Sequence, residues 1–215
     1  GWCHHQRGRS GCGLEKRMIY YIFGKSASGK DTIYKRLKAC HPDWKEVTPY
    51  TTRPIREGEQ EGVEYHFVTD AQMDRFEREG RIIEERRYQT VYGPWRYATV
   101  DDGQITMSDQ KNYLMIGVLQ SYVSTRDYFG ADQVFPIYIE VPDEIRLARA
   151  EARERKEAKP KLQEMRRRFE ADNADFSEAN LAAAGVRKRY QNLDLEACIA
   201  EINDETSKNT GKSNI

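Results

Sequence analysis

Residues 24–32 read Gly24-Lys25-Ser26-Ala27-Ser28-Gly29-Lys30-Asp31-Thr32. They spell the phosphate-binding pattern G-x-x-x-x-G-K, in which backbone N–H groups and the lysine hold a polyphosphate. The residue after the lysine is normally Ser or Thr, whose hydroxyl binds the magnesium ion of a bound nucleotide, and here it is Asp31. The stretch therefore predicts a phosphate site with one altered position on its metal side.

The flanking residues supply the context that a phosphate loop needs. Met18–Phe23 is a continuous apolar run, which is typical of a strand buried on both faces of a parallel sheet. Asp31–Cys40 carries Ile33 and Leu37 at i,i+4 spacing, which predicts a helix. A glycine turn with an incidental lysine would seldom show the order strand, loop, helix. We therefore expect the N–H groups of residues 26–30 and the helix N-terminus to form a nest for phosphate.

Further along the chain, predicted strands and helices alternate. The strands are expected at 18–23, 111–118 and 134–141, and the helices at 31–40, 119–129, 143–176 and 193–202. The long charged segment 143–176 contains Pro160, where we expect a break, and the polar tail 207–215 is predicted to be disordered. The alternation indicates an α/β fold, a P-loop-type parallel sheet covered by helices on both faces.

Residues 44–97 follow a different pattern. Short strands at 64–68 and 81–84 flank a helix that begins with the capping box Thr69-x-x-Gln72 and stops at Gly80. Residues 95–107 are predicted to form a hairpin with Asp101-Asp102-Gly103 as its turn. The region is therefore predicted to be an inserted α+β sub-domain.

Composition excludes some classes of protein. Of the 215 residues, 33% are charged and 38% hydrophobic, as in a globular protein, and no apolar run is as long as a membrane span. We therefore expect no membrane as partner. Lys+Arg and Asp+Glu both total 35, and acidic residues surround the basic run Arg166-Arg167-Arg168, so we expect no nucleic acid either. The four scattered cysteines favour a cytoplasmic location. Residues 1–17 lack a pattern and are expected to be a disordered extension ahead of Met18.

A second group of residues could bind phosphate. Arg53 and Arg56 lie three apart, close to Tyr65, and guanidinium groups match phosphate oxygens. An Arg-Pro-x-Arg loop is as often a solvated turn, so the residues alone leave both interpretations open.

The longer run Thr51-Thr52-Arg53-Pro54-x-Arg56-x-Gly58-Glu59-x-x-Gly62-x-x-Tyr65-x-Phe67 resembles the GMP-binding signature of the guanylate kinase family. The phosphate loop, residues 82–84, Val91-Tyr92-Gly93, the charged helices and Asn192-x-Asp194-Leu195 follow the family's order. The resemblance covers roughly residues 18–203. It implies a core (18–47, 98–142 and 177–206), an acceptor-binding sub-domain (48–97) and a helical lid (143–176).

The resemblance also implies roles for single residues. The ATP-binding residues would be Gly24, Ser26, Ala27, Ser28, Gly29, Lys30, Asp31, Thr32 and, at the adenine, Asn192. The acceptor's phosphate would be held by Arg53, Arg56, Tyr65 and Tyr92, and guanine N1 and N2 by Glu84. The transferring phosphoryl group would meet Lys30 and the lid arginines Arg149, Arg153 and Arg168; Arg146 shares a helix face with the first two of these arginines. A solvated charged helix is the alternative for any single lid arginine.

This chain departs from the family pattern at several positions. Pro49 and Tyr50 occupy the region of a serine that reads guanine O6, and Met115 and Gly117 stand where an Asp-x-Asp pair is usual. The predicted hairpin at 95–107 replaces a helix. Our hypothesis is that Asp31 takes over Mg²⁺ binding, directly or through water. The alternative is that its charge only stabilises the helix N-terminus.

The implied reaction is transfer of the γ-phosphoryl group of ATP, with Mg²⁺, to a nucleoside monophosphate, GMP or dGMP. A related small-molecule kinase, similar to the ribose 1,5-bisphosphate phosphokinases, and a non-catalytic guanylate-kinase-like module that binds proteins remain open as alternatives. Small-molecule nucleotides are the expected partners, and the sequence does not fix the oligomeric state.

Overall fold

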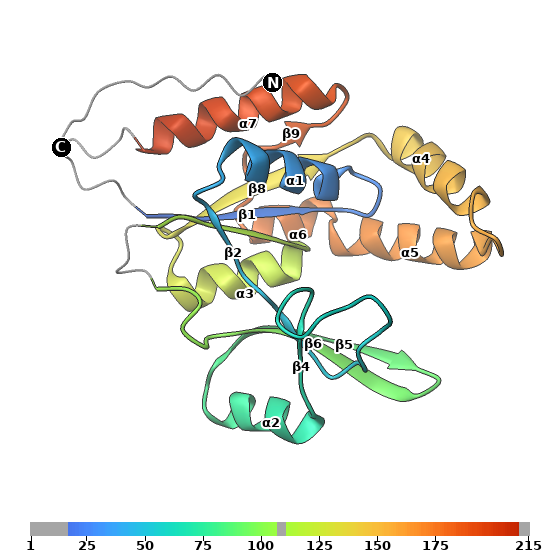
Figure 1. Cartoon of the computed structure of the whole chain (residues 1–215). Helices are drawn as coiled ribbons and strands as arrows, with labels where there is room; N and C mark the ends of the chain where they lie inside the picture. The colour runs from blue at the N-terminus through green and yellow to red at the C-terminus, as the bar shows by residue number, and fades with distance from the viewer. Residues whose placement is uncertain (1–16, 107–110, 211–215) are drawn as a thin grey trace.

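The computed structural model describes residues 17–106 and 111–210 (Figure 1). Within these ranges, the main sheet has five strands, all parallel, in the order β2-β7-β1-β8-β9. The strands are β1 (Ile19–Gly24), β2 (Lys45–Glu46), β7 (Tyr113–Gly117), β8 (Val134–Glu140) and β9 (Tyr190–Gln191). Every residue of β1 is buried, which confirms the prediction that its apolar run is a central strand.

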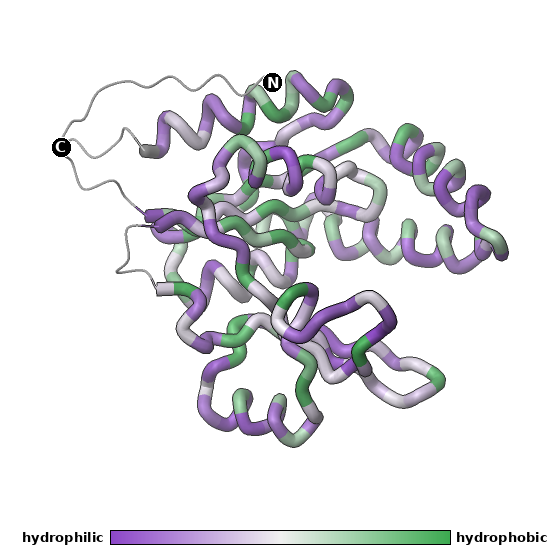
Figure 2. The backbone as a smooth tube through the Cα atoms, viewed as in Figure 1, coloured by the Kyte–Doolittle hydropathy of each residue, from purple (hydrophilic) through white to green (hydrophobic). Residues whose placement is uncertain are grey.

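Helices cover both faces of this sheet (Figure 1). They are α1 (Lys30–Cys40) and α7 (Leu195–Thr210) on one face, and α3 (Leu119–Phe129) and α6 (Glu178–Ala183) on the other. Even-numbered residues of β1 pack with Ile33, Leu37 and Ile199, whereas its odd-numbered residues pack with Tyr122 and Leu181. Figure 2 shows hydrophobic residues gathered along the central strands and polar residues along the outer helices. The doubly covered sheet follows from the alternation of side chains across β1.

A second sheet lies beside the first, in the order β4-β3-β6-β5. Its elements are β3 (Tyr50–Thr51), β4 (His66–Phe67), α2 (Asp70–Arg78), β5 (Ile82–Thr90) and β6 (Gly93–Val100). The helix α2 has the predicted capping box at Thr69 and Gln72 and buries Met73. The inserted α+β unit is therefore present where the sequence predicted it.

The prediction of a hairpin at 95–107 is wrong. The hairpin is formed by β5 and β6, with Thr90 opposite Gly93, whose φ of 97° suits glycine. The Asp102 carboxylate instead accepts hydrogen bonds from the Tyr50 hydroxyl and from the backbone of Gln104. The Asp-Asp-Gly turn thus ends β6 and ties the chain to β3.

The segment predicted to be the lid contains α4 (Asp143–Arg155) and α5 (Leu162–Asp175), which pack on one another to the side of the main sheet (Figure 1). The predicted break at Pro160 is confirmed. The helix α6 was not predicted, and α7 continues to Thr210, so the prediction of disorder from residue 207 is wrong for residues 207–210. Residues 1–16 and 211–215, on which the predictions of disordered ends fall, lie outside the described residues. The division into core, sub-domain and lid stays a prediction.

Candidate active site

The phosphate loop joins β1 to α1, and two of its glycines have no room for a side chain. A Cβ at Gly24 would lie 2.7 Å from the carbonyl oxygen of Ile139. A Cβ at Gly29 would lie 2.4 Å from the Asn192 side-chain nitrogen, and the φ of Gly29 is 83°. Ala27 also has a positive φ, of 61°, which is uncommon for a residue with a Cβ. The loop is therefore held in a tight, specific shape.

Lys30 opens α1 at the end of this loop. Burial lowers the pKa of its ammonium group, and the nearby carboxylates of Asp31 and Asp172 oppose that shift. Asp31 is exposed in the first turn of α1, where a negative charge is favourable next to the helix N-terminus. Two carboxylates thus stabilise the charge of the predicted lysine; Asp31 was predicted as a site residue and Asp172 was not.

Asn192 is hydrogen-bonded to the backbone of the phosphate loop. Its side-chain amide donates a hydrogen bond to the Ser28 backbone carbonyl oxygen at 2.9 Å. The backbone carbonyl oxygen of Asn192 accepts a hydrogen bond from the Arg149 guanidinium at 3.5 Å. Asn192 is only 5% exposed. Its predicted contact with adenine stays a prediction, and in this structure the side chain supports the loop.

The predicted lid contacts the phosphate loop through α5. The Ser26 N–H donates to the Asp172 carboxylate at 2.8 Å, and the Lys25 ammonium donates to Asn173 Oδ1, also at 2.8 Å. Neither Asp172 nor Asn173 was predicted as a site residue. The available signal was the position of Asp172 one helical turn after Arg168, on the same face of α5.

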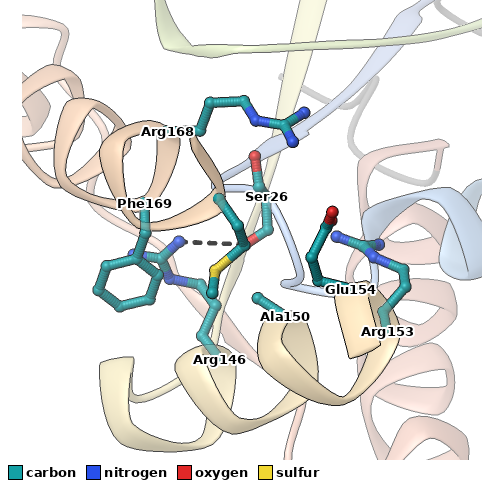
Figure 3. A pocket seen from close by; sticks show the side chains of 8 residues that line it. Ser26, Arg146, Ala150, Arg153, Glu154, Arg168 and Phe169 are labelled. Atoms are coloured by element: carbon teal, nitrogen blue, oxygen red, sulfur yellow. Dashed lines mark hydrogen bonds between the residues drawn. The ribbon is translucent and has the colours of Figure 1, made fainter. Parts of the chain in front are cut away.

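Arg146 is the centre of this contact, as Figure 3 shows. The guanidinium donates to Ser26 O at 3.1 Å and to Asn173 Oδ1 at 2.6 Å, and it lies 3.7 Å from the centre of the Phe169 ring. It also pairs with Asp143 at 3.4 Å and Asp172 at 3.8 Å. Arg146 is 1% exposed, so it joins loop and lid from inside the protein rather than reaching into solvent.

Two of the three predicted lid arginines meet the loop. Arg153 and Arg168 line a cavity of about 200 Å³ together with Ser26 and Glu154 (Figure 3). Arg149 is exposed and lies against the backbone of Asn192 instead. With Arg146, which also lines the cavity, three cations lie beside the loop, where negative charge on a phosphoryl group would be stabilised.

On the predicted acceptor side, Arg53 is buried and preorganised. Its guanidinium forms two parallel hydrogen bonds to Glu59, at 2.8 and 2.9 Å, and lies over the ring of Tyr65. These bonds lower the pKa of Glu59 to about 2. The Arg56 backbone donates to the same carboxylate, so the signature loop is closed around Glu59. Tyr92 is 83% exposed near the tip of the β5–β6 hairpin and stacks on Trp95.

Glu84 lies on β5, buried at the base of the hairpin. One carboxylate oxygen accepts from the Thr99 hydroxyl at 3.1 Å. The other, Oε2, has no hydrogen-bond partner in the described part of the chain, and burial raises the pKa of the carboxyl group. The nearest cation is Arg86, whose Nε lies 3.7 Å from Oε2. The sequence did not single out Arg86, which reads as one of many surface arginines.

A cleft of about 1,100 Å³ runs between β5, α3 and α5. Its wall includes Arg86, Gln120, Arg168, Asp172 and Ser26. The cleft therefore reaches from the predicted acceptor sub-domain to the phosphate loop and the lid, and it has room for a small ligand.

The donor set fits an Mg²⁺ ion held mainly by phosphate oxygens. Among residues 17–106 and 111–210, no three His, Cys, Asp or Glu side chains are grouped so as to hold a metal. Mg²⁺ commonly binds through one or two carboxylates plus substrate phosphates and water, and Asp31 supplies one such carboxylate beside the loop.

Among the helices of residues 17–106 and 111–210, none has the length and apolar character that a membrane span requires.

Comparison with known proteins gives the same family over most of the chain. The guanylate kinase family model matches residues 16–194. The guanylate kinase of Tropheryma whipplei (strain Twist) is 37% identical over 82 residues, which are 38% of this chain and 41% of that protein. That of Thermobifida fusca is 42% identical over 77 residues, 35% of this chain and 39% of that protein. The chain thus matches about two fifths of the length of these relatives.

The fold agrees with a solved structure as well. The crystal structure of guanylate kinase from Anaplasma phagocytophilum matches with a TM-score of 0.61, over 93% of this chain and 89% of that one, at 18% identity. At this identity the likeness concerns the fold alone, a parallel sheet of the P-loop type. The family model, which spans the phosphate loop, the arginine-rich signature and the lid, goes further: this chain belongs to the guanylate kinase family.

Proposed function

We propose that this protein transfers the γ-phosphoryl group of ATP to GMP or dGMP. One observation carries the proposal: Ser26 of the phosphate loop borders both the cavity lined by Arg153 and Arg168 and the cleft that reaches β5. A donor phosphate on the loop would meet an acceptor phosphate from the cleft beside these two arginines. Phosphoryl transfer depends mainly on such in-line positioning and on stabilisation of charge.

The chemistry needs no general base, because the acceptor phosphate is already an anion. Lys30, Arg153 and Arg168 would stabilise the charge on the transferring group, and Arg149 would join them on lid closure. Arg53 and its neighbours Arg56 and Tyr65 would bind the acceptor's phosphate, and Glu84 would accept hydrogen bonds from guanine. Tyr92, which is exposed near the hairpin tip, would donate its hydroxyl to the same phosphate. Lid closure would exclude water and suppress ATP hydrolysis.

Magnesium is proposed as the cofactor, with ATP as co-substrate. A bound Mg²⁺ would supply charge neutralisation to the phosphate groups of the donor nucleotide. Asp31 is the residue of this chain that would hold it, directly or through a water molecule. Small-molecule nucleotides as partners and a cytoplasmic location stay predictions.

The test is phosphoryl transfer from ATP·Mg²⁺ to a panel of GMP, dGMP, AMP, UMP, CMP and ribose 1,5-bisphosphate. We expect transfer to GMP or dGMP to exceed transfer to every other acceptor. Preference for ribose 1,5-bisphosphate would replace the proposal with the related small-molecule kinase. Failure to bind ATP would favour the non-catalytic module.

A further inference from the structure

We propose that Arg86 determines the specificity for the acceptor base, by donating hydrogen bonds to guanine O6 while Glu84 accepts them from N1 and N2. The inference rests on the proposed function, because it concerns the acceptor of that reaction. It assigns a residue to the oxygen of guanine, for which this chain lacks the serine expected near position 49.

The strand geometry puts the two side chains on one face. Glu84 and Arg86 are two residues apart on β5, opposite Thr99 and Tyr97 of β6, so they point to the same side of the hairpin. Glu85 and Arg87 point to the other side, where Glu85 pairs with Arg96 at 2.5 Å and Arg87 with Glu77 of α2 at 3.8 Å. Arg86 is therefore the arginine of this strand that faces the cleft.

Both members of the pair are incompletely bonded. Glu84 Oε2 and Arg86 Nε are buried atoms without a hydrogen-bond partner in residues 17–106 and 111–210. They lie 3.7 Å apart, too far for a hydrogen bond. Leaving such buried groups unpaired is unfavourable, so a ligand that bonds to both would be stabilised. The side chain of Arg86 is 34% exposed, so the rest of its guanidinium is open to a ligand in the cleft.

A guanine base matches this arrangement of charge. Its Watson–Crick edge presents two N–H donors beside the O6 acceptor, which complement a carboxylate next to a guanidinium. Adenine presents an amino donor where guanine has O6, so the same arginine would oppose it. Arginine pairing with guanine O6 and N7 is the commonest base-specific contact of proteins with DNA, because the planar fork fits both acceptors.

Two residues near Glu84 and near position 49 have no hydrogen-bond donor to offer to guanine O6. Pro49 has no side-chain donor, and its carbonyl oxygen already accepts from the His66 N–H at 2.8 Å. Thr99 is buried and its hydroxyl donates to Glu84, so it serves the carboxylate instead. Arg86 is the cation that the structure brings next to Glu84.

The test compares the effect of replacing each of two neighbouring arginines of β5, with acceptor nucleotides that differ from GMP in one substituent of the base. Arg86→Ala is measured beside Arg87→Ala, which faces α2, with GMP, 6-thioguanosine monophosphate and inosine monophosphate. In 6-thioguanosine monophosphate the N–H donors remain and a weakly accepting sulfur replaces O6. Inosine monophosphate keeps O6 and lacks the N2 amine.

We expect Arg86→Ala to lower kcat/KM for GMP by about 10- to 100-fold, chiefly through KM. The loss should be of similar size with inosine monophosphate and below about 3-fold with the thio analogue, which offers little bonding to lose. Arg86→Lys should recover part of the loss, because it retains charge but not the fork. Arg87→Ala should leave all three acceptors within about 3-fold of the unsubstituted protein.

Two results would overturn the inference and leave the proposed function in place. In one, Arg86→Ala keeps the GMP preference and KM of the unsubstituted protein. In the other, kcat falls equally with all three acceptors, which would place Arg86 at the phosphate rather than the base. If the unsubstituted protein itself does not use GMP, the proposed function fails first. Thermal unfolding of each variant, expected within a few degrees of the unsubstituted protein, separates loss of contact from loss of fold.

Discussion

Replacing Arg146 by methionine should destabilise the protein by about 3 kcal/mol, because it removes a buried positive charge and leaves the carboxylates that pair with it uncompensated. Arg146 is 1% exposed and is bonded to Ser26 O and Asn173. Removing one partner of a buried ion pair typically costs about 3–5 kcal/mol. The Asp143 and Asp172 side chains are 51% and 18% exposed, so water can partly solvate them, which favours the lower end of that range.

The assay is thermal unfolding followed by circular dichroism. For a chain of 150–250 residues, 1 kcal/mol shifts Tm by about 2–4 °C, so Arg146→Met should lower Tm by roughly 6–12 °C. Methionine loses the guanidinium that lies over the Phe169 ring, but it retains an unbranched apolar stem, which limits the effect of lost volume. Arg155→Met, at an exposed arginine in the last turn of the same helix, is the control and should stay within about 0.5 kcal/mol. A Tm for Arg146→Met within 2 °C of the control would refute the view that this cation holds loop and lid together.

Three further predictions concern the metal, the acceptor and the core. Asp31→Ala should raise the Mg²⁺ concentration for half-maximal activity by roughly 10-fold, with a matching loss in calorimetric binding of Mg²⁺ and ATP; an unchanged requirement would leave only the helix-terminus role. Because burial raises the pKa of Glu84, its carboxylate takes up a proton at a higher pH than an exposed glutamate does. KM for GMP should therefore rise as the pH is lowered from about 7 to about 5, and Glu84→Gln should abolish that dependence; a parallel profile in both would contradict this assignment. Gly117→Ala should lose about 1–3 kcal/mol in denaturant unfolding, since a Cβ there lies 2.3 Å from both the Tyr21 and Ser121 hydroxyls; full stability would mean that these side chains can move aside.

The sequence was sufficient where local pattern and burial agree. The apolar run before Gly24, the glycines of the loop and the capping box at Thr69 each depend on neighbours within a few positions, and all three appear as predicted. The carboxylate that holds Arg53 belongs to the same short signature, at Glu59. Such features can be predicted because the residues that make them are close in the chain.

The sequence was insufficient where distant segments decide. The Asp-Asp-Gly stretch has a strong turn signal, but its role depends on Tyr50, which is 52 positions away from Asp102. Asp172 accepts a hydrogen bond from Ser26, which lies 146 positions earlier in the chain. On a helix with many charged residues, the sequence does not indicate which carboxylate makes such a contact. Arg86 differs from Arg87 only in the side of the strand to which it points, which the bulge between Ile82 and Glu84 obscures in the sequence.

The long-range contacts of the phosphate loop also set an order of events during synthesis. Ser26 is hydrogen-bonded to Asp172, which is synthesised 146 positions later, and Ser28 to Asn192, which is synthesised 164 positions later. At about 5–20 residues per second, the interval between emergence of the loop and of Asp172 is roughly 7–30 s. Throughout that time the glycine-rich segment lacks the side chains that hold its shape. The loop therefore cannot make these two contacts until the chain has been synthesised as far as Asn192.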